Sequence, residues 1–377
     1  MINSQFYSYP KSRSTAASRS VLPLLIVTGL LISAGLIFIY SASSVLAIEK
    51  YGSASYFVYR QFWGLLLGLI GMLIAYLVPT GWLKKLSPYI YILALAGTAL
   101  TLFPAFALKV HGSSRWLKLA GVSLQPSEFL KLAFILYLAY LLVQKKFQRK
   151  SFWFSFIPLL TIFGLTAAIL LRQPDFGLTV VLSLTMFVLL LIARFSAEYL
   201  FGAMALFLPT AALLIWFKPY RLKRILTFLN PWHDPQGAGF QIIQSLIAVG
   251  SGSWWGVGIG SSKQKFFYLP MQHTDFIFAI MAEEVGFFGS TLIIFLYVLW
   301  LYFGMRLAFG MDNEFEMYLT LGFVILISLQ GLINLCVVTG LFPTKGVGLP
   351  FISYGCSGLV SNLMMLGVIL RAARAQG

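Results

Sequence analysis

The longest polar interruption in this chain is the stretch KPYRLKRILTFLNPWHDPQGAGFQIIQSLIAVGSGSWWGVGIGSSKQKFFYLPMQHTD, residues 218–275. It contains six of the 27 lysines and arginines, two of the three histidines and two of the four aspartates. Asp275 ends the stretch and precedes a long apolar run. We therefore expect this carboxylate where a polar loop enters an apolar helix.

The composition excludes a soluble globular protein. Hydrophobic residues make up 59% of the 377 residues, charged residues make up 10%, and the mean hydropathy is +0.87. This leaves too little polar surface to cover a globule of this size. Apolar runs of about 20 residues, the length of a membrane-spanning helix, recur along the chain. The sequence predicts an all-α polytopic membrane protein with about ten transmembrane helices, at 21–47, 57–79, 87–107, 127–143, 152–171, 177–193, 200–217, 275–303, 318–342 and 357–371.

Lysines and arginines indicate which side of the membrane each loop faces. An even number of helices places both termini on one side, and outside the 218–275 loop 13 basic residues fall on that side against 7 on the other. Short cytoplasmic loops are rich in basic residues, so we expect cytoplasmic termini and a multi-pass protein of the cytoplasmic membrane. The prediction is a tail at 1–20, a single transmembrane domain at 21–371 that includes the extracytoplasmic loop 218–275, and a tail at 372–377. Within the loop, the apolar segment 240–249 is too short to span a bilayer.

Charged side chains inside bilayer helices cost about 2.5 to 3.5 kcal/mol each, so each needs a partner or a function. Glu128 and Lys131 stand at i and i+3, where they either form a structural ion pair or line a polar cavity. Arg60 lies near the outer start of the predicted second helix. Glu283 and Glu284 are adjacent, so their side chains point about 100° apart and we expect them not to share a partner.

Asp275 has two compatible interpretations. Thr274 and Asp275 before a long apolar run are typical of a helix N-cap. A carboxylate near a helix N-terminus also stays ionised, and a general base must be ionised to accept a proton. Lys345 is the one charge in the loop 342–356, and it is either a solvated lysine or a group held towards a ligand.

Several other patterns do not indicate a site. Gly256, Gly258 and Gly260 form a GxGxG, but no strand precedes it and no βαβ unit surrounds it, so it does not predict a nucleotide site. His273 has no second histidine or cysteine at ligand spacing, and we expect a locally hydrogen-bonded loop residue. The net charge of +16 is spread over the flanks of apolar runs, which favours anionic lipid headgroups or a lipid-linked phosphate over nucleic acid.

Motifs along most of the chain resemble those of the SEDS family of polytopic peptidoglycan glycosyltransferases. The matching segments are YRQ (59–61), GSSRWL (112–117), QPSEFLK (125–131), QPDFG (173–177), the loop 221–275, AEE (282–284), PTKG (343–346) and LPFISYG (349–355). Three segments resemble the division-type members more than the elongation-type members: NPW (230–232), FQIIQS (240–245) and SKQKFF (262–267). One departure is that Cys356 and Gly358 stand where the family usually has Gly and Ser.

The resemblance implies an enzyme that polymerises lipid II outside the cytoplasmic membrane in septal wall synthesis. The reaction would be an inverting transfer that forms β-1,4 glycan and releases undecaprenyl pyrophosphate. The family's essential aspartate corresponds to Asp275, the candidate catalytic general base. A sugar on pyrophosphate already has a good leaving group, so one carboxylate is sufficient. The candidate substrate-binding residues, whose basic members would offset charge on the departing pyrophosphate, are Arg60, Arg115, Glu128, Lys131, Lys263, Lys265 and Lys345.

The resemblance also implies partners. They are lipid II, the undecaprenyl-linked nascent glycan, membrane lipid, a class B penicillin-binding transpeptidase and other membrane proteins of the division complex, and they do not include nucleic acid. No cofactor or metal is clearly implied, and a divalent cation is left open. Intramembrane charges are also typical of a transporter, so a lipid II flippase is the main alternative. A scaffolding division protein and the elongation-type enzyme are the others.

Overall fold

The computed structural model describes most of the chain, and every structural statement below concerns the described residues. These are 13–110, 113–119, 122–144, 152–196, 198–199, 202, 205, 209, 216, 219–237, 239–266, 269–270, 272–344 and 346–375.

Nine of the ten predicted helices are present in the described part of the chain. They are α1 (Arg13–Tyr51), α2 (Tyr56–Leu77), α3 (Thr80–Leu100), α4 (Pro126–Leu142), α6 (Ile157–Arg172) with the preceding turn η1 (Phe152–Phe156), α7 (Phe176–Ile192), α11 (Ile277–Phe309), α12 (Glu314–Val338) and α13 (Cys356–Arg374). The predicted helix at 200–217 lies almost entirely outside the described residues. Five of these helices, α1, α2, α11, α12 and α13, are long and apolar enough to cross a membrane. The prediction of a helical membrane protein is confirmed.

Several boundaries differ clearly from the prediction. α1 starts at Arg13, within the predicted tail 1–20, and α11 ends at Phe309, six residues after the predicted end at 303. The helix expected at 87–107 is α3, which starts at Thr80 and ends at Leu100. Lys84 and Lys85 therefore lie inside its first turns. A continuous helix can hold them there because long basic side chains can reach the headgroup layer. The helix expected at 318–342 is α12, which starts at Glu314, where the Asn313 side chain accepts a hydrogen bond from the amide of Phe315.

A small antiparallel sheet lies between α3 and α4, and the sequence pattern did not predict it. Its strands are β1 (Ala107–Val110), β2 (Ser113–Leu119) and β3 (Val122–Leu124), in the order β1-β2-β3. The strands are short, so their alternation of polar and apolar residues is too brief to stand out in the sequence. The sheet matters because β2 carries Arg115.

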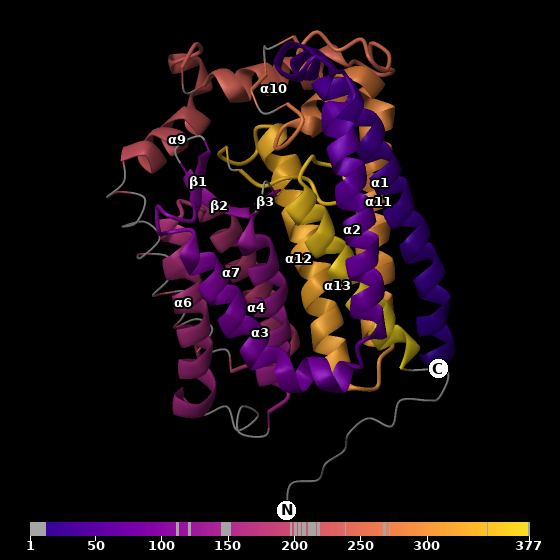
Figure 1. Cartoon of the computed structure of the whole chain (residues 1–377), viewed down its shortest axis with the longest axis vertical. Helices are drawn as coiled ribbons and strands as arrows, with labels where there is room; N and C mark the ends of the chain where they lie inside the picture. Colours follow the sequence, from indigo (N-terminus) through magenta and orange to yellow (C-terminus); the bar gives the residue numbers. More distant parts are fainter. Residues whose placement is uncertain are drawn as a thin grey trace, which may run out of the picture.

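The helices form one bundle with two distinct ends (Figure 1). The start of α1 and the end of α13 lie at one end, whereas the sheet, α9 (Pro219–Leu229) and α10 (Phe240–Ser251) lie at the other. In the bundle α2 packs on α13, α1 on α11 and α3 on α4, and α12 is the most deeply buried long helix. α10 coincides with the apolar segment that was predicted to be too short to span.

α11 is interrupted at Gly286, whose φ of 65° and ψ of −163° are not helical. In an unbroken helix the amides of Phe287 and Phe288 would donate to the carbonyls of Glu283 and Glu284. The interruption removes both hydrogen bonds, so four backbone groups in the middle of an apolar helix need other partners.

The segment 253–258, which follows α10, supplies a partner for each of these four groups. Its amides at Val257 and Gly258 donate to the two freed carbonyls, at 3.0 Å each. Its carbonyls at Ser253 and Trp254 accept from the two freed amides, at 2.8 and 3.3 Å. Four backbone hydrogen bonds therefore join the segment 253–258 to α11.

This backbone approach explains the glycines at 252 and 256, of which Gly256 is the first glycine of the GxGxG pattern. Gly256 has a φ of 81°, and a Cβ there would lie 2.1 Å from the carbonyl oxygen of Glu284. A Cβ at Gly252 would lie 2.0 Å from the carbonyl oxygen of Ala282. Glycine is needed at both positions because the two backbones touch, not because a phosphate binds.

Candidate functional site

Asp275 lies in the turn that precedes α11, and it does not cap that helix. The N-cap of α11 is Phe276, and no side chain donates to or accepts from the first turn there. The N-cap interpretation of Asp275 is therefore wrong, because the turn continues past Asp275 before the helix begins at Ile277. Its carboxylate is half-buried, and its Oδ2 lies near Gly346.

The backbone of Asp275 is tied to the loop between α12 and α13. The Asn334 side-chain amide donates to the carbonyl of Asp275 at 2.8 Å and to the carbonyl of Val347 at 2.7 Å. A Cβ at Gly346 would lie 3.4 Å from Oδ2 of Asp275 and 3.5 Å from Nη1 of Arg115. One point of this loop therefore faces both the candidate base and a guanidinium.

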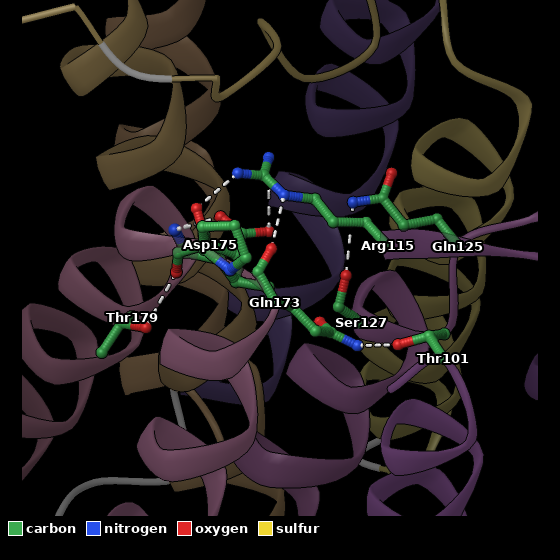
Figure 2. Close-up of polar contacts among 9 residues, drawn as sticks. Thr101, Arg115, Gln125, Ser127, Gln173, Asp175 and Thr179 are labelled. Atoms are coloured by element: carbon green, nitrogen blue, oxygen red, sulfur yellow. Dashed lines mark hydrogen bonds and ion pairs between the residues drawn. The ribbon is translucent and has the colours of Figure 1, made fainter. Parts of the chain in front are cut away.

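Arg115 is held from several sides (Figure 2). Its Nε donates to the carbonyl of Gln173 at 3.3 Å and its Nη2 to the carbonyl of Pro174 at 2.6 Å. Its Nη1 lies 3.8 Å from Oδ2 of Asp175, whose other oxygen caps α7. Three contacts fix the plane of the guanidinium, and the Nη1 that lies near Asp175 also faces the point at Gly346 that Asp275 faces.

The Gln173 side chain in turn ties this arrangement to α3. Its Nε2 donates to the carbonyl of Thr98 at 2.9 Å and to the hydroxyl of Thr101. Gln173 and Asp175 are both almost fully buried, so the platform under Arg115 is rigid.

The environment of Asp275 is suited to proton transfer. Loss of hydration raises the pKa of Asp275 to about 6, although the positive charges of Arg115 and Arg224 lower it and the carboxylate of Asp175 raises it. A carboxylate with this pKa is ionised at neutral pH and still basic enough to accept a proton. Asp275 is therefore fit to serve as a general base.

Glu128 and Lys131 form the ion pair that their spacing predicted. The Nζ of Lys131 lies 2.6 Å from Oε2 of Glu128 and donates to Oε1 of Gln330 and Oδ1 of Asn362, at 3.1 Å each. Lys131 is fully buried, so all three of its N–H groups have partners. These contacts of Lys131 join α4, α12 and α13. Gln330 also donates to the carbonyl of Gly348 at 3.2 Å, which links the three helices to the loop after α12.

Glu283 and Glu284 both bind the loop after α10. Glu283 accepts hydrogen bonds from the hydroxyl of Ser262 and from the amide of Lys263, the latter at 3.0 Å. Glu284 accepts from the amide of Ser262 at 3.4 Å and from the hydroxyl of Ser41 on α1. The expectation that the two glutamates would not share a partner is wrong, because Ser262 offers two donors in different directions.

The other candidate substrate-binding residues lie apart from Asp275. Arg60 is exposed on α2 and donates to the Tyr56 hydroxyl at 3.1 Å. Lys263 is exposed, and Lys265 is buried and donates to the carbonyl of Gly260. In the described residues no contact joins these three to Asp275. Lys345 lies outside the described residues, between two residues that belong to this loop.

Two further sequence expectations can be compared with the structure. The ring of His273 packs on Phe57 with 4.6 Å between centroids and faces Tyr354 at 5.6 Å, while its Nδ1 has no hydrogen-bond partner. Burial, followed by the charge of Lys50, lowers the pKa of His273 to about 4, so its ring is neutral. No group of three or more histidine, cysteine or acidic side chains suited to a metal ion occurs in the described residues.

Cys356 begins α13 with ordinary helical geometry, so this substitution needs no positive φ.

The structure adds residues that were not proposed from the sequence. Asp175 and Arg224 both act on Asp275 through their charges, and Gln330 and Asn334 hold the loop behind it. Gln330 and Asn334 could have been identified from the sequence, because two side-chain amides at i and i+4 in an apolar helix are polar groups that need partners. Arg224 had none beyond its membership of the polar loop.

Comparisons with known proteins show which chains this protein is similar to. The family model FTSW_RODA_SPOVE, described as "Cell cycle protein", matches residues 22–377. Proteins named probable peptidoglycan glycosyltransferase FtsW are similar, including one from Geobacter sp. (strain M18) that is 40% identical over 90% of this chain and 92% of its own length. Stage V sporulation protein E of Bacillus subtilis is 41% identical over 93% of this chain and 96% of its own length.

Solved structures show the same fold. A chain from a peptidoglycan synthase complex, described as coordinating polymerization and crosslinking, is 30% identical with a TM-score of 0.75, over 94% of this chain and 97% of that chain. The rod shape determining protein RodA of Thermus thermophilus is 26% identical with a TM-score of 0.69, over 94% of this chain and 96% of that chain. With a family match over nearly its whole length, this multi-pass membrane protein belongs to the FtsW/RodA/SpoVE family of cell cycle proteins.

Proposed function

We propose that the chain is a peptidoglycan glycosyltransferase that polymerises lipid II during septal wall synthesis, with Asp275 as its general base. The names of its relatives support the activity and the division role. The single observation that carries the catalytic assignment is that Asp275 and Arg115 face one point, at Gly346. The strand β2, which carries Arg115, lies at the end of the bundle opposite the start of α1 and the end of α13.

The reaction needs one proton to leave the acceptor sugar. Asp275 would take the proton from the acceptor 4-hydroxyl as its oxygen attacks the anomeric carbon of the other sugar. The bond from that carbon to the pyrophosphate breaks with inversion, and the pyrophosphate leaves with the electron pair. A positioned base contributes about 10² to 10⁴ to the rate of such a step.

Arg115 supports the leaving group in this proposal. Two of its N–H groups are committed to the carbonyls of Gln173 and Pro174, so the guanidinium is already oriented before substrate binds. A preoriented cation stabilises charge that develops on a diphosphate without further reorganisation. Lys345 belongs to the same loop and remains a proposed second cation.

The proposal gives different tasks to the remaining candidates. Lys131 and Glu128 would keep the loop 346–348 in place through Gln330, and they would not touch the reacting atoms. Arg60, Lys263 and Lys265 remain proposed contacts to parts of the substrate farther from the glycosidic bond.

Topology and partners follow from the same assignment. The reaction end would face outward, which places both termini in the cytoplasm and makes residues 21–371 a single catalytic domain of the cytoplasmic membrane at the septum. A class B penicillin-binding transpeptidase is the proposed partner, supported by the similarity to a chain of a peptidoglycan synthase complex. Other division proteins and the undecaprenyl-linked glycan are the remaining proposed partners.

The test is glycan polymerisation from purified lipid II by the wild-type protein and by Asp275→Asn, each alone and with the cognate transpeptidase. Loss of about 10²-fold or more in rate, with partner binding intact, is the expected result. Equal polymer from the Asn variant would refute Asp275 as the base. If the wild type made no polymer with its partner but moved lipid II across a vesicle membrane, the flippase alternative would replace the proposed function.

A further inference from the structure

A second arginine reaches the Asp275 site from an element that the proposed mechanism does not use. Arg224 lies on α9, the short helix at the outer end of the bundle. Its Nη1 donates to the carbonyl oxygen of Thr344 at 3.3 Å. Thr344 is two residues before Gly346, the point that faces both Asp275 and Arg115.

We propose that Arg224 is a positioning residue for the glycosyl transfer: through the Thr344 carbonyl it fastens α9 to the loop behind Asp275 and keeps a second cation beside that carboxylate. This inference rests on the proposed function of Asp275 as the base. It assigns a role to α9 and accounts for one of the outward basic residues in the polar loop.

The charges around Asp275 support this role. Arg115 from β2 and Arg224 from α9 both lower the pKa of Asp275, and Asp175 before α7 raises it. Lys345, on the same loop as Thr344, lies outside the described residues. Arg224 therefore acts with Arg115 against the desolvation that raises the pKa of Asp275.

The neighbouring residue provides a matched comparison. Lys223 is also exposed and also on α9, but its Nζ lies 3.5 Å from Oδ2 of Asp234. It lines a hollow of about 580 Å³ between α9 and the turn η2 (Pro231–His233). Consecutive residues of a helix point about 100° apart, so Lys223 faces η2 while Arg224 faces the loop at Thr344.

The first experiment is the pH dependence of kcat/KM for polymerisation by the full-length protein with its transpeptidase. The variants are Arg224→Gln, Arg224→Lys and the control Lys223→Gln. Without the Arg224 charge Asp275 binds its proton at higher pH, so the acid limb of Arg224→Gln should move to higher pH. We expect about a threefold larger loss of rate between pH 8 and pH 6 than in the wild type. Arg224→Lys should keep the wild-type limb because it keeps the charge.

The second experiment measures the contact without turnover. Hydrogen exchange of the peptide 341–348 should be faster in Arg224→Gln than in the wild type and unchanged in Lys223→Gln. Because Arg224 is exposed, its replacement removes no buried contact and the variants should fold.

Two results would overturn the inference. One is an acid limb in Arg224→Gln at the wild-type position, and the other is an equal shift in Lys223→Gln, which would show a general surface-charge effect. Failure of the proposed function would look different, since Asp275→Asn would then polymerise as well as the wild type. In that case the exchange of peptide 341–348 would still decide whether Arg224 holds the loop.

Discussion

Asp275 and Glu283 are eight residues apart on one segment, and their surroundings contrast. Glu283 is 2% exposed, and its oxygens accept hydrogen bonds from three successive residues of the loop 262–264. The carboxylate of Asp275 is half-buried, and among the described residues no donor binds it, although two arginines lie near. The first carboxylate is therefore bound by the loop 262–264, whereas the second faces charged side chains.

The difference shows how an apolar bundle separates structural from reactive carboxylates. A buried carboxylate that accepts hydrogen bonds from several loop groups holds that loop in place. A partly hydrated carboxylate beside cations keeps its charge near neutral pH and remains accessible. Both kinds occur here on one segment, Asp275 just before α11 and Glu283 within its first turns, before the interruption at Gly286.

The sharpest test of this comparison measures rate and stability for both residues. Asp275→Asn should lose about 10² to 10⁴ in polymerisation rate without any loss of thermal stability. Glu283→Ala should lose stability by about 3 kcal/mol or more, because several buried donors lose their acceptor. Thermal unfolding in detergent measures the second effect, with Glu49→Gln, at an exposed position, as control. A Glu283→Ala protein that is stable but inactive would contradict the structural role of Glu283.

The backbone junction at Gly286 predicts a smaller effect at Gly256. Gly256→Ala should destabilise the protein by about 2 kcal/mol or more, since the new Cβ meets the Glu284 carbonyl and the φ is positive. Gly260→Ala is the matched control, because Gly260 has a φ of 84° but no atom within 4 Å of a Cβ. The difference in melting temperature between the two variants isolates the backbone contact. Equal melting temperatures would mean that the segment 253–258 does not hold α11.

The raised pKa of Asp275 predicts the pH dependence of the rate. The base must be ionised, so kcat/KM should be full well above pH 6 and fall about tenfold per pH unit well below it. Asp275→Asn should abolish that limb in whatever activity remains. A limb near pH 4 in the wild type would contradict the desolvated environment of Asp275.

The same pKa predicts the smallest effect, on stability. Because the folded pKa of about 6 exceeds the usual value near 3.9, the folded state binds the proton more tightly than the unfolded state. Asp275 therefore costs stability as the pH rises from about 4 through 6. Asp275→Asn should melt about 1 to 3 °C above the wild type at pH 7.5 and show no gain at pH 4. A lower melting temperature at pH 7.5 would indicate a structural carboxylate.

How much could be predicted from the sequence differs from residue to residue. The Glu128 and Lys131 pair was predictable because i and i+3 spacing on a helix is local geometry. Asp275 was identified, but its possible N-cap role could not be tested from sequence, since the helix start depends on how the preceding turn packs. The strand that carries Arg115 was missed because short strands are stabilised by their pairing and not by their own pattern.

The sequence by itself determined that this is a helical membrane protein, where most of its helices lie and which carboxylate to test first, because hydropathy, helix length and motifs are local properties of the chain. Only the tertiary structure decided what each charge does. It placed Arg115 and Gly346 opposite Asp275, gave Glu283 to the loop 262–264, and filled the break at Gly286 with the segment 253–258. These outcomes depend on residues distant in sequence, since a buried polar group is satisfied by whatever donor the fold brings to it.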